Sequence, residues 1–336
     1  MSKVFIIAEA GVNHNGSIEL AQKMVDAAID MGADIVKFQT YVPERLVTRN
    51  APLADYQRKN QDEDSQFAML KKLSLSFDEF RSLADYCSKR GVPFMSTPFD
   101  EMSVEFLHSL GMNCWKIPSG EITNYPYLKK IASFGEKVIM STGMSTIDEV
   151  SDAVALLREF GTDDITLLHC TTEYPAPIDS VNLYAMDALR EKFNVNVGYS
   201  DHTADIFTAT LAAARGASVI EKHFTLDKNL PGPDHKASLT PSEFSDMVKS
   251  IRKVETVLGS VIKEPCTAEL SNRSVARKSI VADLDISKGE IFTEKNLTTK
   301  RPGLGINPMK WNSLIGKTAK RSYKSDERID ESELEE

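Results

Sequence analysis

Eight short apolar runs alternate with longer helix-like stretches along the first two thirds of the chain, and this alternation restricts the possible folds more than any other feature. Alternating strands and helices form parallel β-α units, and eight units within about 250 residues favour a closed (β/α)8 TIM barrel. A doubly wound open sheet is the alternative. We predict strands over residues 4–8, 34–38, 93–96, 113–117, 137–141, 165–170, 196–199 and 218–222.

The segments between these strands are helix-like, and many of them end at a glycine. Glycine adopts the left-handed conformation that ends a helix more readily than any other residue. We therefore expect helices over residues 17–31, 76–90, 101–110, 147–160 and 204–215, followed by Gly32, Gly91, Gly111, Gly161 and Gly216.

The chain changes character after Gly259. We expect a barrel domain over residues 1–262, a linker over 263–275 and a small β-rich domain over 276–336. A module of about 60 residues is only marginally stable by itself. We therefore expect it to dock on the barrel or on a second subunit.

The composition argues against several kinds of partner. With 40 Lys and Arg against 49 Asp and Glu, the net charge of −9 does not provide the basic surface that nucleic acids require. No apolar run approaches the roughly 18 residues that span a bilayer, and the start has no signal-peptide cleavage pattern. The four cysteines form no Cys-x-x-Cys pair, as expected of reduced thiols. We expect a soluble, cytoplasmic protein with neither nucleic-acid nor membrane partners.

Polar residues gather where the predicted strands end. In a TIM barrel, catalytic groups lie at the carboxyl ends of the strands, and polar groups are costly inside the barrel core. The sequence therefore predicts a polar site at one mouth. The strand ends supply Glu9, Lys37, Gln39, Thr97, Lys116, Ser119, Glu121, Ser141, Thr172, Ser200, His202 and His223.

His202 and His223 end neighbouring strands, so their imidazoles can converge. Two neutral imidazoles with carboxylates and water form a common divalent-metal site, and the mixed nitrogen and oxygen set fits Mn²⁺ or Mg²⁺. The alternative is that both are ordinary core or rim groups. Further metal candidates are Asp201, Glu221 and Asp234, with His235 a weaker one.

Lys37 and Lys116 occupy positions in their predicted strands from which alternate side chains face the lumen of the barrel. Two ammonium groups among hydroxyls suit the binding of a small, multiply charged anion such as a phosphate ester. The alternative is that both lysines extend to solvent and bind nothing. The sequence has no G-x-G-x-x-G and no G-x-x-x-x-G-K-[ST] motif, which disfavours dinucleotides and nucleoside triphosphates. The surrounding hydroxyls belong to Thr97, Ser119, Ser141 and Ser200.

Two carboxylates, Glu9 and Glu121, are candidates to carry protons or to orient a polyol, and ion pairing with the lysines is their alternative role. The remaining histidines favour structural roles: His14 in a turn, His108 near a helix end, and His169 facing away from the lumen. Arg301 lies in a Pro- and Gly-flanked turn, where it is either solvated or held for insertion into another surface.

Ordered motifs along nearly the whole chain resemble the sialic acid synthase family, and the tail looks like its antifreeze-like SAF domain of β-clip fold. The motifs are IAEAGVNHNGS, KFQT, STPFD, WKIPSGE, STGM, HCTTEYP, GYSDH, EKHFTLDKNLPGPDHKAS and KRPGLGI. The resemblance implies condensation of phosphoenolpyruvate with an open-chain N-acetylmannosamine-type sugar, which gives a nine-carbon 2-keto acid and phosphate.

The resemblance also implies a role for each matching residue. The family's Mn²⁺ or Mg²⁺ falls on His202 and His223, and Thr172 stands where the family often has Asn. Arg301 matches the arginine delivered into the other subunit's active site, which implies a domain-swapped homodimer. Phosphoenolpyruvate contacts fall on Thr97, Lys116, Ser119, Ser141, Thr172 and Ser200, with Lys37 close by. Sugar contacts fall on Gln39, Glu121, Tyr174, Asp234 and Arg301.

These residues suggest a mechanism. The metal polarises the sugar aldehyde, and C3 of phosphoenolpyruvate, held by Lys116 and the hydroxyls, attacks the aldehyde carbon. Water then adds at C2, and C–O cleavage releases phosphate. Glu121 is the preferred proton carrier, and Glu9 assists in orientation.

The predicted activity is that of an N-acetylneuraminate synthase. The alternative is an N,N'-diacetyllegionaminic acid synthase that uses 2,4-diacetamido-2,4,6-trideoxymannose. The loop GPDHKAS disfavours a pseudaminic acid synthase, because the resemblance implies a GPDS-type loop for those enzymes. A non-catalytic carbohydrate- or ice-binding protein is the alternative from another class, and the polar groups of the barrel mouth argue against it.

Overall fold

The computed structural model describes residues 3–58 and 63–335. The chain separates into two compact units, Met1–Gly259 and Ser260–Glu336, which are described one at a time. None of the described helices is long and apolar enough to cross a membrane.

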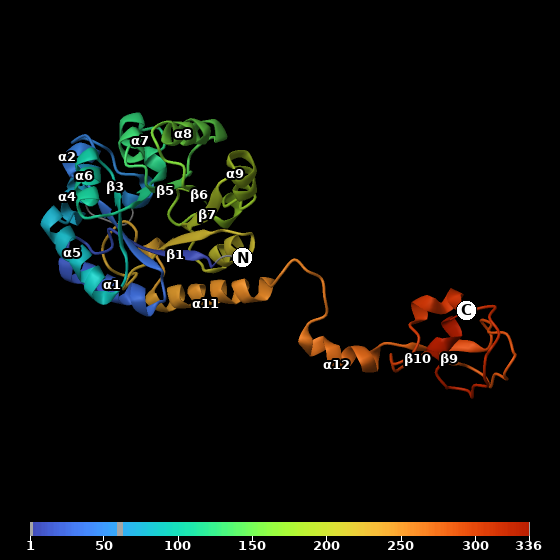
Figure 1. The fold of residues 1–336 in the computed structure, drawn as a ribbon. Helices are drawn as coiled ribbons and strands as arrows, with labels where there is room; N and C mark the ends of the chain where they lie inside the picture. Colours follow the sequence, from blue (N-terminus) through green and yellow to red (C-terminus); the bar gives the residue numbers. More distant parts are fainter. Residues whose placement is uncertain (1–2, 59–62, 336) are drawn as a thin grey trace. The chain divides into compact units, whose positions relative to one another are not determined.

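The first unit contains a ring of eight parallel strands (Figure 1). Their hydrogen-bonded order is β3-β2-β1-β8-β7-β6-β5-β4, and β3 and β4 at its two ends contact each other. This order follows the sequence around the ring, so the predicted TIM barrel is confirmed and the doubly wound alternative is wrong. The strands are β1 Phe5–Gly11, β2 Ile35–Thr40, β3 Phe94–Pro98, β4 Cys114–Ile117, β5 Lys137–Ser141, β6 Ile165–Cys170, β7 Asn196–Asp201 and β8 Val219–His223.

Helices surround the strands, and their ends are set by local sequence. Ser76, Thr146 and Thr240 each cap a helix and form a capping box with the glutamate three residues later. All five glycines predicted to follow helices have positive φ. The helices after the strands are α1 Ile18–Asp30, α5 Phe77–Arg90, α6 Glu101–Ser109, α7 Tyr125–Ala132, α8 Ile147–Glu159, α9 Ala185–Phe193, α10 Phe207–Ala214 and α11 Pro241–Leu258.

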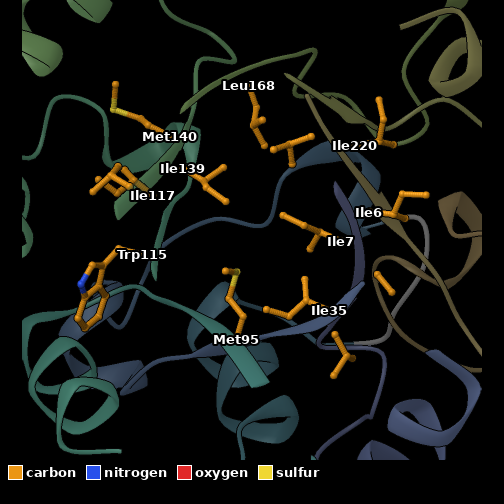
Figure 2. Packing of buried hydrophobic residues seen from close by; sticks show 14 of the residues in the cluster. Ile6, Ile7, Ile35, Met95, Trp115, Ile117, Ile139, Met140, Leu168 and Ile220 are labelled. Carbon is orange, nitrogen blue, oxygen red and sulfur yellow. The ribbon is translucent and has the colours of Figure 1, made fainter. Parts of the chain in front are cut away.

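Alternate side chains of each strand face the lumen, where they pack into an apolar layer. Figure 2 shows Ile7, Met95 and Ile139 pointing toward the middle of the ring. Two residues further along β1 and β3, the same parity presents Glu9 and Thr97. The polar residues of the mouth therefore lie next to this apolar layer, on the side of the carboxyl ends of the strands.

An insertion follows β2, in a stretch where the sequence predicted no element. It contains α2 (Pro43–Leu46), α3 (Asp55–Arg58) and α4 (Gln66–Leu73). A small apolar cluster of its own holds the insertion together, formed by Val12, Tyr41, Leu53, Met69 and Leu73. This cluster packs the insertion against Val12, which follows β1, and Phe99, which follows β3.

The second unit is small and rich in turns. Helix α12 (Thr267–Ala276) lies where we expected a linker, and β9 (Ser279–Ala282) pairs antiparallel with β10 (Leu297–Lys300). Its apolar core includes Ile280, Phe292, Leu314, Tyr323 and Ile329.

Candidate active site

A cavity opens at the carboxyl ends of the barrel strands, as the barrel predicts. One predicted site residue, Arg301, belongs to the second unit, which is described separately. Fourteen predicted site residues line the cavity: Glu9, Lys37, Gln39, Thr97, Lys116, Ser119, Glu121, Ser141, Thr172, Tyr174, Ser200, His202, His223 and Asp234.

Two lysines and two glutamates form a buried cluster at the bottom of the cavity. Nζ of Lys37 lies 2.7 Å from Oε2 of Glu9 and 3.5 Å from Oε2 of Glu221, whereas Nζ of Lys116 lies 3.6 Å from Oε1 of Glu221. All four side chains are at most 6% exposed. Buried charges need such partners because each has lost its hydration. Glu221, predicted as a metal candidate, is therefore the shared partner of both lysines.

The two lysines differ in how well their charge is compensated. Burial lowers the pKa of both ammonium groups, but Glu221 and Glu9 reverse this shift for Lys37, whose pKa is raised. The pKa of Lys116 stays below its ordinary value because burial outweighs the attraction of Glu221. Burial alone would raise the pKa of Glu221, but Lys116 and Lys37 lower it to about 2. Lys116 is thus the lysine whose positive charge is not fully balanced by neighbouring carboxylates.

Hydroxyl groups surround Lys116. Its Nζ donates to Oγ of Ser141 at 2.7 Å, while Oγ of Ser119 accepts from the backbone N–H of Gly143 at 2.8 Å. Oγ1 of Thr172 is buried and has no hydrogen-bond partner among the described residues. A cation and a free hydroxyl in one cavity suit an oxyanion.

Gly143 is needed for the close packing of these groups. A Cβ at this position would lie 2.2 Å from Oγ1 of Thr172 and 2.9 Å from both Sγ of Cys170 and Oγ of Ser119. The Gly in the motif STGM is therefore explained by space rather than by a positive φ.

The two predicted metal-binding histidines lie side by side, with 5.6 Å between their ring centroids. Nδ1 of His202 lies 2.7 Å from the carbonyl oxygen of Thr171, which only accepts hydrogen bonds, so Nδ1 donates and Nε2 keeps its lone pair. Nδ1 of His223 is buried without a hydrogen-bond partner among the described residues. Burial lowers the pKa of His202 to about 4 and that of His223 well below its ordinary value. Both rings are therefore neutral, the form that binds metals.

Other predicted metal candidates are engaged elsewhere. The Asp201 carboxylate is buried against Lys222, and His235 bonds to Thr225 and Asn15. Among residues 3–58 and 63–335, no group of three or more His, Cys, Asp or Glu side chains is arranged to hold a metal. The imidazole pair nevertheless fits a cation such as Mn²⁺ or Mg²⁺ that keeps its other positions for water or substrate oxygens.

Two more carboxyl groups line the cavity. Burial raises the pKa of Glu121, whose Oε2 accepts from Nδ2 of Asn124 at 2.5 Å. Burial and the nearby Glu9 raise the pKa of Asp234 to about 7. Carboxyl groups with raised pKa are suited to proton transfer near neutral pH.

The remaining histidines have structural surroundings. Nδ1 of His14 accepts from the backbone N–H of Gly16 in a turn, His108 stacks on Phe134, and Nε2 of His169 bonds to the carbonyl oxygen of Val181. His14 thus lies in the expected turn and His108 in the last turn of α6, and their structural roles stay predictions.

Sequence reasoning missed one wall of the cavity. It is formed by the insertion, and the only signal was that residues 41–75 are too many for a simple loop between a strand and its helix. The wall is mainly apolar, with two amides, and consists of Leu46, Val47, Gln57, Gln66, Met69, Leu70 and Leu73.

Comparison with known proteins agrees with this geometry. The NeuB family matches residues 24–263, and the SAF domain matches residues 277–335. The chain belongs to the NeuB family. This confirms the resemblance to sialic acid synthases and the SAF domain of the tail, and it confirms an enzyme rather than a non-catalytic binding protein.

Two curated relatives carry the same name. N,N'-diacetyllegionaminic acid synthase of Campylobacter jejuni is 50% identical over 334 residues, covering 98% of this chain and 100% of the relative. The protein of that name from Legionella pneumophila is 49% identical over 317 residues, covering 93% and 89%. Among solved structures, the N-acetylneuraminic acid synthetase of Leptospira borgpetersenii has a TM-score of 0.71 and 33% identity, covering 81% of this chain and 90% of that one.

Proposed function

We propose that this NeuB-family enzyme is an N,N'-diacetyllegionaminic acid synthase, which condenses phosphoenolpyruvate with 2,4-diacetamido-2,4,6-trideoxymannose. Our first expectation, N-acetylneuraminate synthase, gives way to the alternative because both reported curated relatives, about half identical over nearly the whole chain, are legionaminic acid synthases. The observation that carries the reaction class is the undercompensated Lys116 in the same cavity as a pair of neutral imidazoles.

Phosphoenolpyruvate is assigned to the lysine side of the cavity. Lys116 lacks full compensation, and a phosphate or carboxylate oxygen supplies the negative charge that it needs. The free hydroxyl of Thr172 offers a further donor. The other contacts proposed for phosphoenolpyruvate come from Lys37, Thr97, Ser119, Ser141 and Ser200, which line the same cavity.

The sugar is assigned to other residues of the same cavity lining, with contacts from Gln39, Glu121, Tyr174 and Asp234. The apolar insertion wall, which includes Leu46, Met69 and Leu73, suits the methyl groups of a deoxygenated, twice N-acetylated sugar. A divalent cation on His202 and His223, Mn²⁺ or Mg²⁺, would polarise the sugar aldehyde when bound.

The chain's own residues then have defined tasks. Lys116 and its hydroxyls hold phosphoenolpyruvate so that its C3 forms a bond to the aldehyde carbon, and Glu121 gives a proton to the new hydroxyl oxygen. Water adds at C2, and the bond between C2 and the oxygen that bridges to phosphorus then breaks. C2 becomes the ketone, and the proton that the added water gives up leaves with phosphate. Glu9 accepts from Nε2 of Gln39 at 3.0 Å and so orients that sugar contact.

We also propose a domain-swapped homodimer in which Arg301 of one copy enters the mouth of the other. Its support is a set of large exposed apolar side chains near the first turns of the helices that follow the strands: Met102, Tyr125, Met144 and Phe207. The second unit likewise exposes Leu304 and Met309 close to Arg301 in sequence. The cytoplasmic location stays a prediction.

Phosphate release from phosphoenolpyruvate, measured with a panel of acceptor sugars with and without a chelator, tests the proposal. We expect turnover with 2,4-diacetamido-2,4,6-trideoxymannose to exceed turnover with N-acetylmannosamine, and the chelator to abolish it. Faster turnover with N-acetylmannosamine would overturn the substrate assignment, and no phosphate release with any sugar would overturn the reaction class.

A further inference from the structure

A fully buried ion pair lies directly beside the two histidines. Nζ of Lys222 is 2.7 Å from Oδ2 of Asp201, and neither side chain is exposed. The two residues are partners in the parallel register of β7 and β8. Side chains alternate in direction along each strand, so Asp201 and Lys222 point away from the lumen, whereas His223 faces into it. Asp201 and Lys222 are each one residue before a histidine, His202 and His223.

This pair holds the backbone on both sides of His202. Oδ1 of Asp201 accepts from the backbone N–H of Thr203 at 2.9 Å and from its hydroxyl at 2.8 Å. Nζ of Lys222 donates to the carbonyl oxygen of Thr203 at 2.5 Å. One ammonium group on β8 therefore ties together residues 201 and 203, while its own backbone continues directly into His223.

General stability does not explain a charged pair at this place. Replacing a buried ion pair with apolar side chains of similar volume is often neutral or stabilising, because burial removes the hydration of both charges. Other outward positions of the barrel strands carry no acidic or lysine side chain: many are apolar, such as Ile6, Trp115 and Ile220 in Figure 2, and Thr40 and Ser96 are uncharged. The charged pair Asp201–Lys222 lies at the place where the imidazoles of His202 and His223 must keep a fixed separation.

We propose that Lys222, together with Asp201 and Thr203, positions His202 and His223 so that the imidazole pair holds a divalent cation. The three are positioning residues and not ligands. Groups that orient metal ligands in this way typically change metal affinity by about 10- to 100-fold when they are lost. The inference rests on the metal site of the proposed function, but not on the identity of the sugar.

Titration of the full-length protein with Mn²⁺ alone, followed by the electron paramagnetic resonance signal of free Mn²⁺, tests the proposal without turnover. The main variant, Asp201→Asn/Lys222→Met, removes both charges together. The milder Thr203→Val removes one hydroxyl and decides the question if the double variant does not fold. The control Asp34→Asn/Arg252→Met removes a less buried pair at the amino end of the barrel.

We expect the Kd for Mn²⁺ to rise about 10- to 100-fold in Asp201→Asn/Lys222→Met. We expect a smaller rise of the same sign in Thr203→Val and no change in the control, although its thermal midpoint falls. Wild-type affinity in both positioning variants overturns the inference if His223→Ala abolishes binding. If His223→Ala binds normally, the metal site itself is refuted. If the affinities change as expected but no sugar supports turnover, the proposed function fails while the inference stands.

Discussion

The two ends of the barrel differ in how their charged groups are buried and paired. At the amino end, the Asp34 carboxylate accepts from Lys3, from Arg252 and from the backbone N–H of Ile6. These donors outweigh the effect of burial and lower the pKa of Asp34. At the carboxyl end, Lys116 is more deeply buried yet incompletely compensated. The contrast indicates that charge at the amino end stabilises the fold, whereas charge at the mouth is kept for a ligand.

The largest expected effect is on Lys116. Lys116→Met removes the undercompensated cation, so kcat/KM for phosphoenolpyruvate should fall by about 10³ or more, while the thermal midpoint changes little because Lys37 still pairs with Glu221. Steady-state kinetics and thermal unfolding measure the two quantities. Lys137→Met, at the amino end of β5, is the control and should leave both nearly unchanged because its ion pair to Asp164 is exposed and 3.9 Å long. A large loss of stability in Lys116→Met would break the comparison.

An intermediate effect is expected from crowding at the mouth. The new methyl group of Gly143→Ala displaces Thr172, Cys170 or Ser119, so kcat/KM should fall roughly 10- to 100-fold. Removing the nearest obstacle in Gly143→Ala/Thr172→Ala should recover part of the loss, which the same kinetic measurement detects. Equal kinetics for Gly143→Ala and the wild type would show that this side of the cavity does not contact the reactants.

The smallest effect is expected at the amino end. Asp34→Asn should lower the free energy of unfolding by about 1 kcal/mol at pH 7, with unchanged kcat/KM. Because the folded pKa of Asp34 lies below the unfolded value near 3.8, the stabilisation is present above that value and is lost as the pH falls through the folded pKa. Denaturant unfolding of both proteins at pH 7 and near pH 3 checks this. A difference that grew on acidification would contradict the assignment.

Much of the fold was predictable because strand and helix patterns are local. The strands at 137–141 and 165–170 match the prediction residue for residue, and most others differ by one or two residues at their ends. Cavity residues such as Lys37 and Thr97 were predictable because strand parity and the barrel's carboxyl ends fix their direction.

The pairing of charges was not predictable in the same way. Asp201 was a metal candidate because it adjoins His202, but alternation turns it outward to Lys222. Likewise, Glu221 as partner of both lysines depends on distances across the ring that no local pattern encodes. The insertion wall was missed because its short helices give little periodic signal.

The insertion after β2 has an apolar cluster of its own, mostly separate from the packing of the barrel. A segment anchored in this way can be exchanged or remodelled in evolution while the ring of strands stays unchanged, together with the strand residues assigned to phosphoenolpyruvate. Enzymes on this scaffold can thus diversify their acceptor without rebuilding their chemistry.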